Sequence, residues 1–335
     1  IQGNGMEILR RTMTGYASHP NLAGVLMVGL GCEVNQIPDW LKEAGLEVGS
    51  LLQTMVIQES GGTRKTVERG VSMVREMIPD FKSIQRQTVP ASHLTLGLEC
   101  GGSDAYSGIT ANPSLGAAAD LLVRHGGTAI LSETPEIYGA EHLLTRRAVS
   151  EKVGRKIVDL IQWWEDYTMR NKAEMNNNPS PGNKAGGLTT ILEKSLGAVA
   201  KGGTSPLQQV YQYAETVTSK GFVFMDSPGY DPVSVTGQVA AGANVVCFTT
   251  GRGSVFGCKP APSLKLATNS TMYRHIEEDM DVNCGEVLDG GKSVQQMGEE
   301  IFQLILDTAS GKPSKSEAQG FGDHEFLPWQ MGAVM

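Results

Sequence analysis

One pattern recurs along the sequence: a short apolar run, then a polar glycine-rich turn, then a segment with helical periodicity. Apolar runs of this length that alternate with helices are typical of parallel strands covered on both faces. The pattern therefore predicts an α/β fold with a mostly parallel sheet and helices on both of its faces. The predicted strands are residues 22–29, 51–57, 94–98, 127–131, 221–225 and 244–248, and the clearest helices are 63–77 and 150–170.

Composition narrows the class of function. The chain has 335 residues, 19% charged residues and a formal net charge of -8. Because binding to phosphate backbones needs a basic surface, this charge argues against nucleic acid as a partner. No apolar stretch approaches the roughly 18 residues that a membrane span needs. The five cysteines are scattered, which favours reduced thiols and a cytoplasmic protein.

Two thiol–carboxylate pairs follow predicted strands, Cys32-Glu33 and, in Cys100-Gly-Gly-Ser-Asp104, Cys100 with Asp104. In open parallel sheets ligands bind at the carboxyl ends of the strands, so these pairs are placed where a ligand would lie. Thiolate with carboxylate suits iron, zinc or manganese. The alternative is that both cysteines are small buried residues that fill strand ends, as most free cysteines do. Spacing alone leaves both interpretations open.

Two further strand ends carry pairs of carboxylates. Glu133 and Glu136 follow one predicted strand, and Asp226 and Asp231 follow another. A carboxylate in this position can bind a metal or act as a general base. It can equally cap the helix that follows, where Asp and Glu are favoured. The sequence does not separate the two roles.

The segment Gly251-Arg252-Gly253 also follows a predicted strand and resembles an anion cradle, because Arg252 offers a bidentate fork to a carboxylate. A solvated loop charge is the alternative. Lys184 and Lys194 are candidates for a base or a carboxylate clamp, although most lysines are surface charges. The glycines match neither GxGxxG nor a P-loop, so nucleotide binding is weakly supported. We interpret the remaining cysteines as structural: Cys247, Cys258 and Cys284.

Taken in order, these loops resemble the altronate dehydratase and galactarate dehydratase family of sugar-acid dehydratases. The most particular segment is Leu-Glu-Cys-Gly-Gly-Ser-Asp at 98–104, which continues through Ser-Gly-Ile-Thr-Ala-Asn-Pro at 107–113. The resemblance covers almost the entire chain, and it is nearer to the altronate side through 136–144 and 226–231. The other matching segments are 19–26, 28–33, 132–136, 139–144, 178–187, 193–197, 248–253 and 266–269.

The resemblance implies a fold and a domain organisation. It implies a variant Rossmann-like sheet, an N-terminal α/β subdomain over residues 1–90 and a C-terminal Rossmann-like catalytic domain over 91–335. The first subdomain is expected to be incomplete, since Ile1-Gln2-Gly3 lacks an initiator methionine and a signal-peptide core. The family's small N-terminal β-rich domain, and a glycine–cysteine segment that could add a third thiol ligand, are expected in the same or a separate chain. A homo-oligomer is also expected.

The resemblance further implies a hydro-lyase that uses Fe²⁺, or Mn²⁺ or another divalent cation, to convert a sugar acid, D-altronate first, to a 2-keto-3-deoxy acid. A Lewis acid stabilises the charge that develops when the C2 proton is removed. The implied metal neighbourhood is Cys32, Glu33, Cys100 and Asp104, with Glu133 as a further candidate. The implied catalytic residues are Lys184, Glu133 and Asp104, and the implied substrate-binding residues are Ser103, Asn112, Asn183, Thr250 and Arg252.

Three alternatives stay open. The substrate could be galactarate instead of altronate. The same scaffold could serve a sulfo-lyase that eliminates sulfite from 3-sulfolactate, since relatives of the family do so. The chain could also be a non-enzymatic module that binds small anions or nucleotides, because fold analogy does not fix function.

Overall fold

The computed structural model describes residues 3–331. The chain forms two compact units, one made of the residues up to Val89 with the segment from Trp329, and the other of Pro90–Pro328. Each unit has its own parallel sheet. Within residues 3–331, no helix combines the length and the apolar character that crossing a membrane requires.

The first unit is built around a strand–helix–strand motif with two parallel strands. The indole of Trp40 is buried between helices, and its nitrogen donates a hydrogen bond to Thr14 Oγ1 at 3.2 Å. This contact anchors the connecting helix to the helix that precedes the first strand. The elements are α1 (Asn4–Ala17), β1 (Val25–Gly29), α2 (Ile37–Ala44), β2 (Leu52–Val56) and α3 (Thr63–Lys82).

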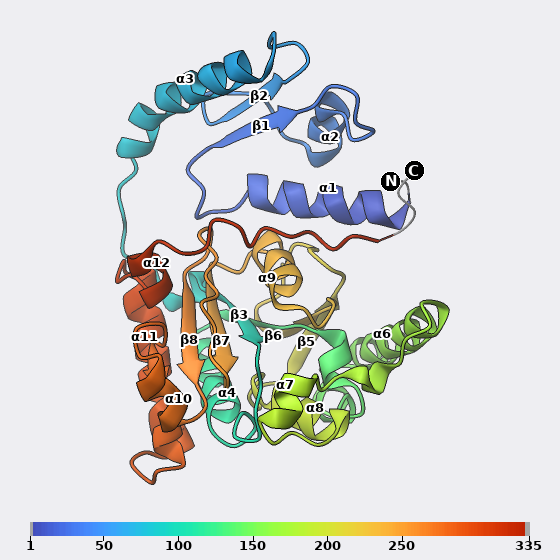
Figure 1. Cartoon of the computed structure of the whole chain (residues 1–335), viewed down its shortest axis with the longest axis vertical. Coiled ribbons are helices and arrows are strands. Elements are labelled where there is room, and N and C mark those ends of the chain that lie inside the picture. Colours follow the sequence, from blue (N-terminus) through green and yellow to red (C-terminus); the bar gives the residue numbers. More distant parts are fainter. Residues whose placement is uncertain (1–2, 332–335) are drawn as a thin grey trace. The chain divides into compact units, whose positions relative to one another are not determined.

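The second unit contains a seven-stranded sheet in which every pairing is parallel, with the strand order β5-β6-β4-β3-β7-β8-β9 (Figure 1). From β3 the chain adds β4, then the edge strand β5, then β6 between them, and it crosses to the other side of β3 with β7. The strands are β3 (Thr95–Cys100), β4 (Thr128–Leu131), β5 (Leu207–Tyr211), β6 (Gly221–Met225), β7 (Val245–Thr250), β8 (Ser263–Ala267) and β9 (Val282–Asn283).

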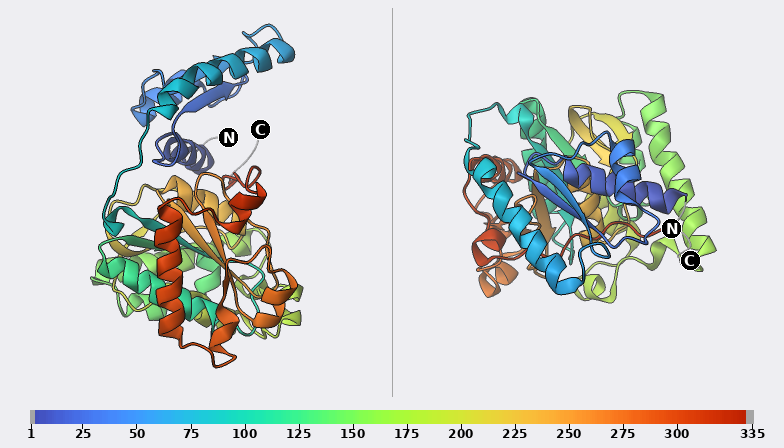
Figure 2. Two further views of the ribbon diagram at one scale, coloured as in Figure 1. Left: turned by 90° about the vertical axis from the view of Figure 1, so that its left-hand side faces the viewer. Right: turned by 90° about the horizontal axis from the view of Figure 1, so that it is seen from above.

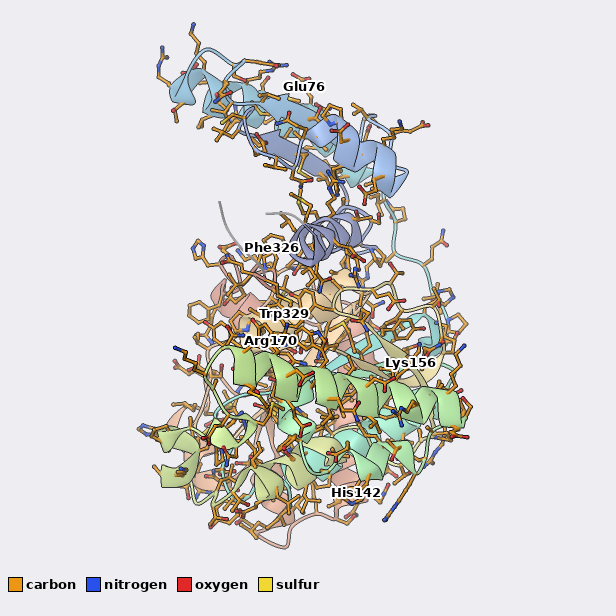
Figure 3. The ribbon with its side chains drawn as sticks, turned by 90° about the vertical axis from the view of Figure 1, so that its right-hand side faces the viewer. Glu76, His142, Lys156, Arg170, Phe326 and Trp329 are labelled. Carbon is orange, nitrogen blue, oxygen red and sulfur yellow. The ribbon has the colours of Figure 1, made fainter. Side chains whose placement is uncertain are left out.

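Helices cover both faces of this sheet. One long helix, α11, packs along α4 (Figure 2). The longest, α6, carries Lys156 and Arg170 towards its two ends (Figure 3). Lys156 Nζ ties α6 to the edge strand β5 by donating to Gln209 Oε1 at 2.8 Å. The α-helices are α4 (Ala111–Arg124), α5 (His142–Thr145), α6 (Glu151–Arg170), α7 (Pro181–Ala185), α8 (Ile191–Ala200), α9 (Asp231–Ala240), α10 (Ser270–His275), α11 (Val294–Ala309) and α12 (Lys315–Gln319). The 3₁₀ turns are η1 (Ala91–His93), η2 (Thr134–Ile137), η3 (Met175–Asn177) and η4 (Cys284–Val287).

The two faces of the sheet differ in chemistry because successive side chains of a strand point to opposite sides. Leu96 and Leu98 of β3 belong to a large apolar core shared with α4, α6 and α11. On the other face, α9 lies so close to β3 that a Cβ on Gly97 would be 2.3 Å from Gln238 Oε1. Glu99 points to this second face and is fully buried there.

The α/β fold with a parallel sheet flanked by helices is confirmed. All six predicted strands are present, and β6 has the predicted bounds. The strands β5, β8 and β9 were not predicted. In Figure 1, β7 and β8 point towards the side of the unit where α7 and α8 lie. This is the carboxyl edge of the sheet.

Candidate active site

A polar pocket of about 490 Å³ lies at the carboxyl edge of the sheet in the second unit. It is next to the boundary between β3 and β7, where the chain reverses its direction of growth across the sheet. Such a switch point is where open α/β sheets bind ligands, because the loops diverge there. The pocket is lined by Cys100, Gly101, Gly102, Glu136, Asn178, Ser180, Gly182, Asn183, Lys194, Gly229, Tyr230, Asp231 and Arg252.

A thiol and two carboxylates meet at one side of the pocket. Cys100 ends β3, and Glu133 and Glu136 follow β4, its neighbour in the sheet. Cys100 Sγ lies 3.4 Å from Glu136 Oε2 and 3.8 Å from Glu133 Oε2. One potential ligand atom of each lies within 4.8 Å of the other two. All three side chains are buried.

Two buried lysines of one helix face this cluster. Lys194 lies in α8 and Lys201 caps its C-terminus, seven residues and two turns later, so both point to the same side. Lys194 Nζ is paired with Glu136 Oε1. Lys201 Nζ donates to Cys100 Sγ at 2.8 Å and lies 3.5 Å from Glu133 Oε2.

Two more carboxyl groups, those of Glu99 and Asp231, lie next to the cluster on the side of Glu133. Glu99 accepts hydrogen bonds at Oε2 from Ser234 Oγ (2.7 Å) and Gln238 Nε2 (3.2 Å), both on α9. Asp231 is the first residue of α9. Carboxylate oxygens of Glu99, Glu133 and Asp231 lie within 4.8 Å of one another. The site therefore gathers four acidic side chains around one thiol.

Burial and crowding shift the acid–base properties of these groups. Burial, together with the charges of Glu136 and Glu99, raises the pKa of Glu133 well above its usual value. Burial also raises the pKa of Glu99, and it raises the pKa of the Cys100 thiol to about 11. For Asp231, burial and the charges of Glu99 and Glu136 raise the pKa to about 7.

The groups next to the lysines behave differently. Burial favours the neutral form of Glu136, but the charges of Lys194 and Lys201 outweigh it and hold the pKa of Glu136 below its usual value. Burial would also neutralise Lys201, yet Cys100 and Glu133 raise the pKa of Lys201 above its ordinary value. We therefore describe Glu136 as a carboxylate and both lysines as ammonium groups.

Glu133 stands out in backbone and side chain. Its φ of 69° and ψ of 68° lie in the left-handed region, which non-glycine residues rarely adopt and which costs conformational energy. The backbone is held there because the Glu133 amide donates to Ser227 Oγ at 2.9 Å. Glu133 Oε1 is buried and has no hydrogen-bond partner among the described residues. A buried, unpaired acceptor is unfavourable unless a ligand satisfies it.

Asp104, which was predicted as a metal ligand and catalytic residue, lies in the loop after β3 but outside the cluster of Cys100, Glu133 and Glu136. Its carboxylate accepts hydrogen bonds from Ser107 Oγ (3.0 Å), Thr268 Oγ1 (2.9 Å) and Asn269 Nδ2 (3.1 Å). It is not part of either group of potential ligands found among the described residues. These contacts join the loop after β3 to the loop after β8.

The predicted substrate-binding residues divide into two sets. Arg252 and Asn183 line the pocket, and Arg252 Nη1 donates to the carbonyl of Gly182 in α7 at 2.6 Å. Asn112 does not line it: Nδ2 donates to the Gly197 carbonyl at 2.9 Å, and Oδ1 accepts from Thr249. Two further residues are buried and do not line the pocket: Ser103, in the loop after β3, and Thr250, the last residue of β7.

Three other predicted residues are not among the residues that the second unit brings together at the pocket. Lys184, on α7, is exposed and does not line the pocket. Cys32 is exposed on the first unit, after β1. Glu33 folds back onto its own loop, where Oε1 accepts from the Leu30 amide at 2.9 Å and Oε2 from the Gly31 amide at 2.5 Å. The convergence of Cys32 and Cys100 on one cation stays a prediction.

Sequence reasoning missed Glu99 and Lys201 as members of the site. Glu99 had a usable signal, because a carboxylate inside a buried parallel strand is unusual and needs partners. Lys201 could also have been recognised from the sequence, because Lys194 and Lys201 are seven residues apart in a helical segment whose other residues are largely apolar. Asp231 was predicted either to bind a metal or act as a general base or to cap a helix, and the sequence did not separate these roles.

Two family models match this chain. The model described as D-galactarate/altronate dehydratase, C-terminal, matches residues 91–334. The model described as D-galactarate dehydratase/altronate hydrolase, second domain, matches residues 1–82.

Curated relatives agree with the family models. The chain is 39% identical over 319 residues to an altronate dehydratase of Bacillus subtilis (strain 168), covering 95% of this chain and 63% of the relative. It is 38% identical over 324 residues to a galactarate dehydratase (L-threo-forming) of Escherichia coli (strain K12), covering 95% and 62%. The chain thus spans less than two thirds of the length of these two relatives.

The chain covers a larger share of a third relative. The chain is 31% identical over 329 residues to a (2R)-sulfolactate sulfo-lyase subunit beta of Chromohalobacter salexigens, covering 97% of this chain and 83% of the relative. The C-terminal family model nevertheless matches most of the chain, and it matches the unit that holds the pocket. This chain belongs to the D-galactarate/altronate dehydratase family.

Proposed function

We propose that this chain carries the catalytic region of a metal-dependent hydro-lyase that dehydrates a sugar acid to a 2-keto-3-deoxy acid in the cytoplasm. We put D-altronate first among its substrates. The observation that carries the proposal is the buried cluster of Cys100, Glu133 and Glu136 beside a polar pocket. Family membership supports the reaction class, since the matching relatives are named as dehydratases.

The charges of the cluster fit a divalent cation. Four carboxyl groups, Glu99, Glu133, Glu136 and Asp231, face two ammonium groups, Lys194 and Lys201. A bound cation would supply the positive charge that favours the ionised forms of the three carboxyl groups whose pKa values are raised. The unpaired Oε1 of Glu133 provides a free acceptor. A thiol with carboxylates is a donor set for Fe²⁺, Mn²⁺ or Zn²⁺ rather than for Mg²⁺ or Ca²⁺.

We assign Cys100, Glu133 and Glu136 to hold the cation, with Fe²⁺ as the first choice. Cys32, Glu33 and Asp104 stay predicted ligands. When bound, the cation would act as a Lewis acid that stabilises negative charge on the oxygens of the substrate. Lys201, which donates to Cys100 Sγ, would keep the thiol side of the site in place.

The pocket residues of the chain can hold an anionic polyol. Arg252 lies on one wall and offers a fork that suits a carboxylate. Asn178 is a hydrogen-bonding wall residue, already oriented because its Oδ1 accepts from Lys194 Nζ at 3.0 Å and its Nδ2 donates to Glu136 Oε1 at 3.2 Å. Fixing the substrate at both ends would align the C2 proton and the C3 hydroxyl with groups on the pocket wall.

The direct test is an anaerobic assay of the full-length protein loaded with Fe²⁺, offered D-altronate, galactarate and other hexonates and hexarates. We expect keto-acid formation, with D-altronate turned over fastest. Because identity to the altronate and galactarate dehydratases is nearly equal, both acids belong in the panel. Absence of a keto acid from every sugar acid would contradict the proposed reaction.

A second candidate function is sulfolactate sulfo-lyase activity. It is supported by the 31% identity to the sulfo-lyase subunit, which extends over 97% of this chain. Including 3-sulfolactate in the panel and measuring sulfite separates the two activities. A pure binding module would show a thermal shift with sugar acids or nucleotides but no turnover.

A further inference from the structure

A series of hydrogen bonds connects helix α6 to the turn that carries Glu133 and Glu136. Trp164 Nε1, on α6, donates to Asp226 Oδ1 at 2.8 Å. Thr134 Oγ1 donates to the same oxygen at 2.5 Å. Thr134 directly follows Glu133 and begins η2, the short turn that also contains Glu136. The hydrogen bonds therefore end on the segment that carries both carboxylates.

The register of the sheet places Asp226 beside this turn. The strands β4 and β6 are paired, and Glu133 and Asp226 each lie two residues beyond the last pair, Leu131 with Phe224. Ser227 adds two contacts at the same level. Its Oγ accepts from the Glu133 amide at 2.9 Å, and its carbonyl oxygen accepts from the amide that follows at 3.0 Å. The loop after β6 thus holds the loop after β4 through side chains and backbone.

These contacts matter because the turn has an unfavourable backbone conformation. Glu133 has a φ of 69°, and a residue other than glycine keeps such a conformation only where its surroundings hold it. In this conformation Cys100 Sγ lies 3.8 Å from Glu133 Oε2 and 3.4 Å from Glu136 Oε2. Relaxation of the Glu133 backbone would redirect the side chains of the turn and separate these three groups.

Asp226 itself is not part of the cluster that it supports. Its side chain is 4% exposed, does not line the pocket and belongs to neither group of potential metal ligands found in residues 3–331. It does not cap α9 either, since Tyr230 is the residue at that N-terminus. Both Trp164 and Thr134 donate to one oxygen, so these contacts need an acceptor at that point and not a negative charge.

We propose that Asp226 is a positioning residue, which acts through Thr134 to hold Glu133 and Glu136 where both can bind one cation. The inference rests on the cation site of the proposed function. It does not depend on the charge of the cation, because the bonds that carry it end on a hydroxyl, an indole and backbone amides. Groups that orient metal ligands in this way affect metal affinity without touching the metal.

The experiment is a titration of the metal-free full-length protein with Co²⁺, which binds the same kinds of donor as Fe²⁺. The thiolate-to-Co²⁺ absorption band reports binding. Asp226→Ala removes the acceptor, whereas Asp226→Asn keeps an oxygen that can accept. Thr134→Val removes the donor and keeps the shape of the side chain, whereas Thr134→Ser keeps the hydroxyl group.

Asp281→Ala is the matched control. Asp281 also holds its surroundings through hydrogen bonds to its carboxylate, which accepts from the backbone amides of Lys265 at 2.7 Å and Lys315 at 2.9 Å. It does not line the pocket. D281A should therefore lower the urea midpoint of the protein without changing its affinity for Co²⁺.

We expect D226A and T134V each to weaken Co²⁺ binding by about 10–100-fold, the range for groups that orient metal ligands. D226N and T134S should bind nearly as tightly as the unmodified protein. The double variant D226A/T134V should be no weaker than the weaker single variant, because both changes break the same bond. If D226A does not fold, T134V and T134S carry the test.

Three results would overturn the inference and leave the cation site in place: D226N as weak as D226A, undiminished affinity in T134V, or an equal loss of affinity in D281A. The first would show that Asp226 acts through its charge, and the third that lost stability alone weakens binding. If the unmodified protein binds no Co²⁺, the cation site of the proposed function fails, and the inference fails with it.

Discussion

Asp231 should make the metal-free protein less stable as the pH rises, and Asp231→Asn should remove this dependence. The raised pKa of Asp231, about 7 against 3.8 for the ordinary group, means that the folded state binds the proton more tightly than the unfolded state. Between these two values the folded chain carries more protons, so its free energy of unfolding falls as pH increases. Above pH 7 the buried, ionised Asp231 lowers the free energy of unfolding by its full amount, and below pH 4 this penalty vanishes.

The magnitude follows from the two pKa values. One pKa unit corresponds to about 1.4 kcal/mol, and integration of the linkage relation from pH 5 to pH 8 gives an upper figure of about 3 kcal/mol for the change in this penalty. The advantage of D231N over the unmodified protein should therefore grow by up to about 3 kcal/mol between pH 5 and pH 8. The constant cost of burying an amide cancels in this difference.

The assay is urea denaturation of the chelator-treated protein at pH 5 and pH 8, with D39N as the control. D39N should show the same difference from the unmodified protein at both pH values, because Asp39 is exposed. A D231N stability difference that is equal at the two pH values would refute the account of crowded, buried carboxyl groups.

Other substitutions test the rest of the site. Lys201→Met removes a buried ammonium between Cys100 Sγ and Glu133 and should lower the free energy of unfolding by about 3–5 kcal/mol, the cost of breaking a buried pair; a urea midpoint unchanged at pH 8 would contradict this. Gly101→Ala should displace the Asp231 carboxylate, because a Cβ at position 101 would be 2.1 Å from Asp231 Oδ2. The kcat should then fall at least about tenfold while circular dichroism stays unchanged; full activity would disprove the close approach. Lys194→Met removes an ammonium group from the pocket wall and should raise KM for the acid by about tenfold or more in steady-state kinetics. A larger effect of Lys184→Met would favour Lys184, the lysine that the resemblance implied.

Much of the fold could be predicted because parallel strands buried on both faces are apolar throughout. Residues 221–225 are such a run, and β6 has these bounds. The strand β5 was missed because Leu207–Tyr211 contains two glutamines and lies at the edge of the sheet. The strand β8 was missed because it carries Lys265, a charged residue that is nevertheless buried, with its Nζ donating to the Phe256 carbonyl at 3.1 Å.

The candidate site was predictable in location but less so in membership. Strand-end loops had to meet at one edge, which placed Cys100, Glu133 and Glu136 together. Which carboxylate turns inwards depends on local hydrogen bonds that sequence does not reveal. Asp104 is held by the loop after β8, and the tertiary approach of α8 brings Lys201 to Cys100. That Cys32 and Cys100 bind the same cation stays a prediction.

The central claim is that Cys100, Glu133 and Glu136 hold one divalent cation. It is tested most directly by anaerobic titration of the metal-free protein with Fe²⁺, followed by metal analysis, for the unmodified protein and for Cys100→Ser and Glu133→Gln. We predict one tightly bound Fe²⁺ per chain in the unmodified protein and at least about tenfold weaker binding in each variant. Stoichiometric binding of undiminished affinity in both variants would place the cation elsewhere and contradict the account.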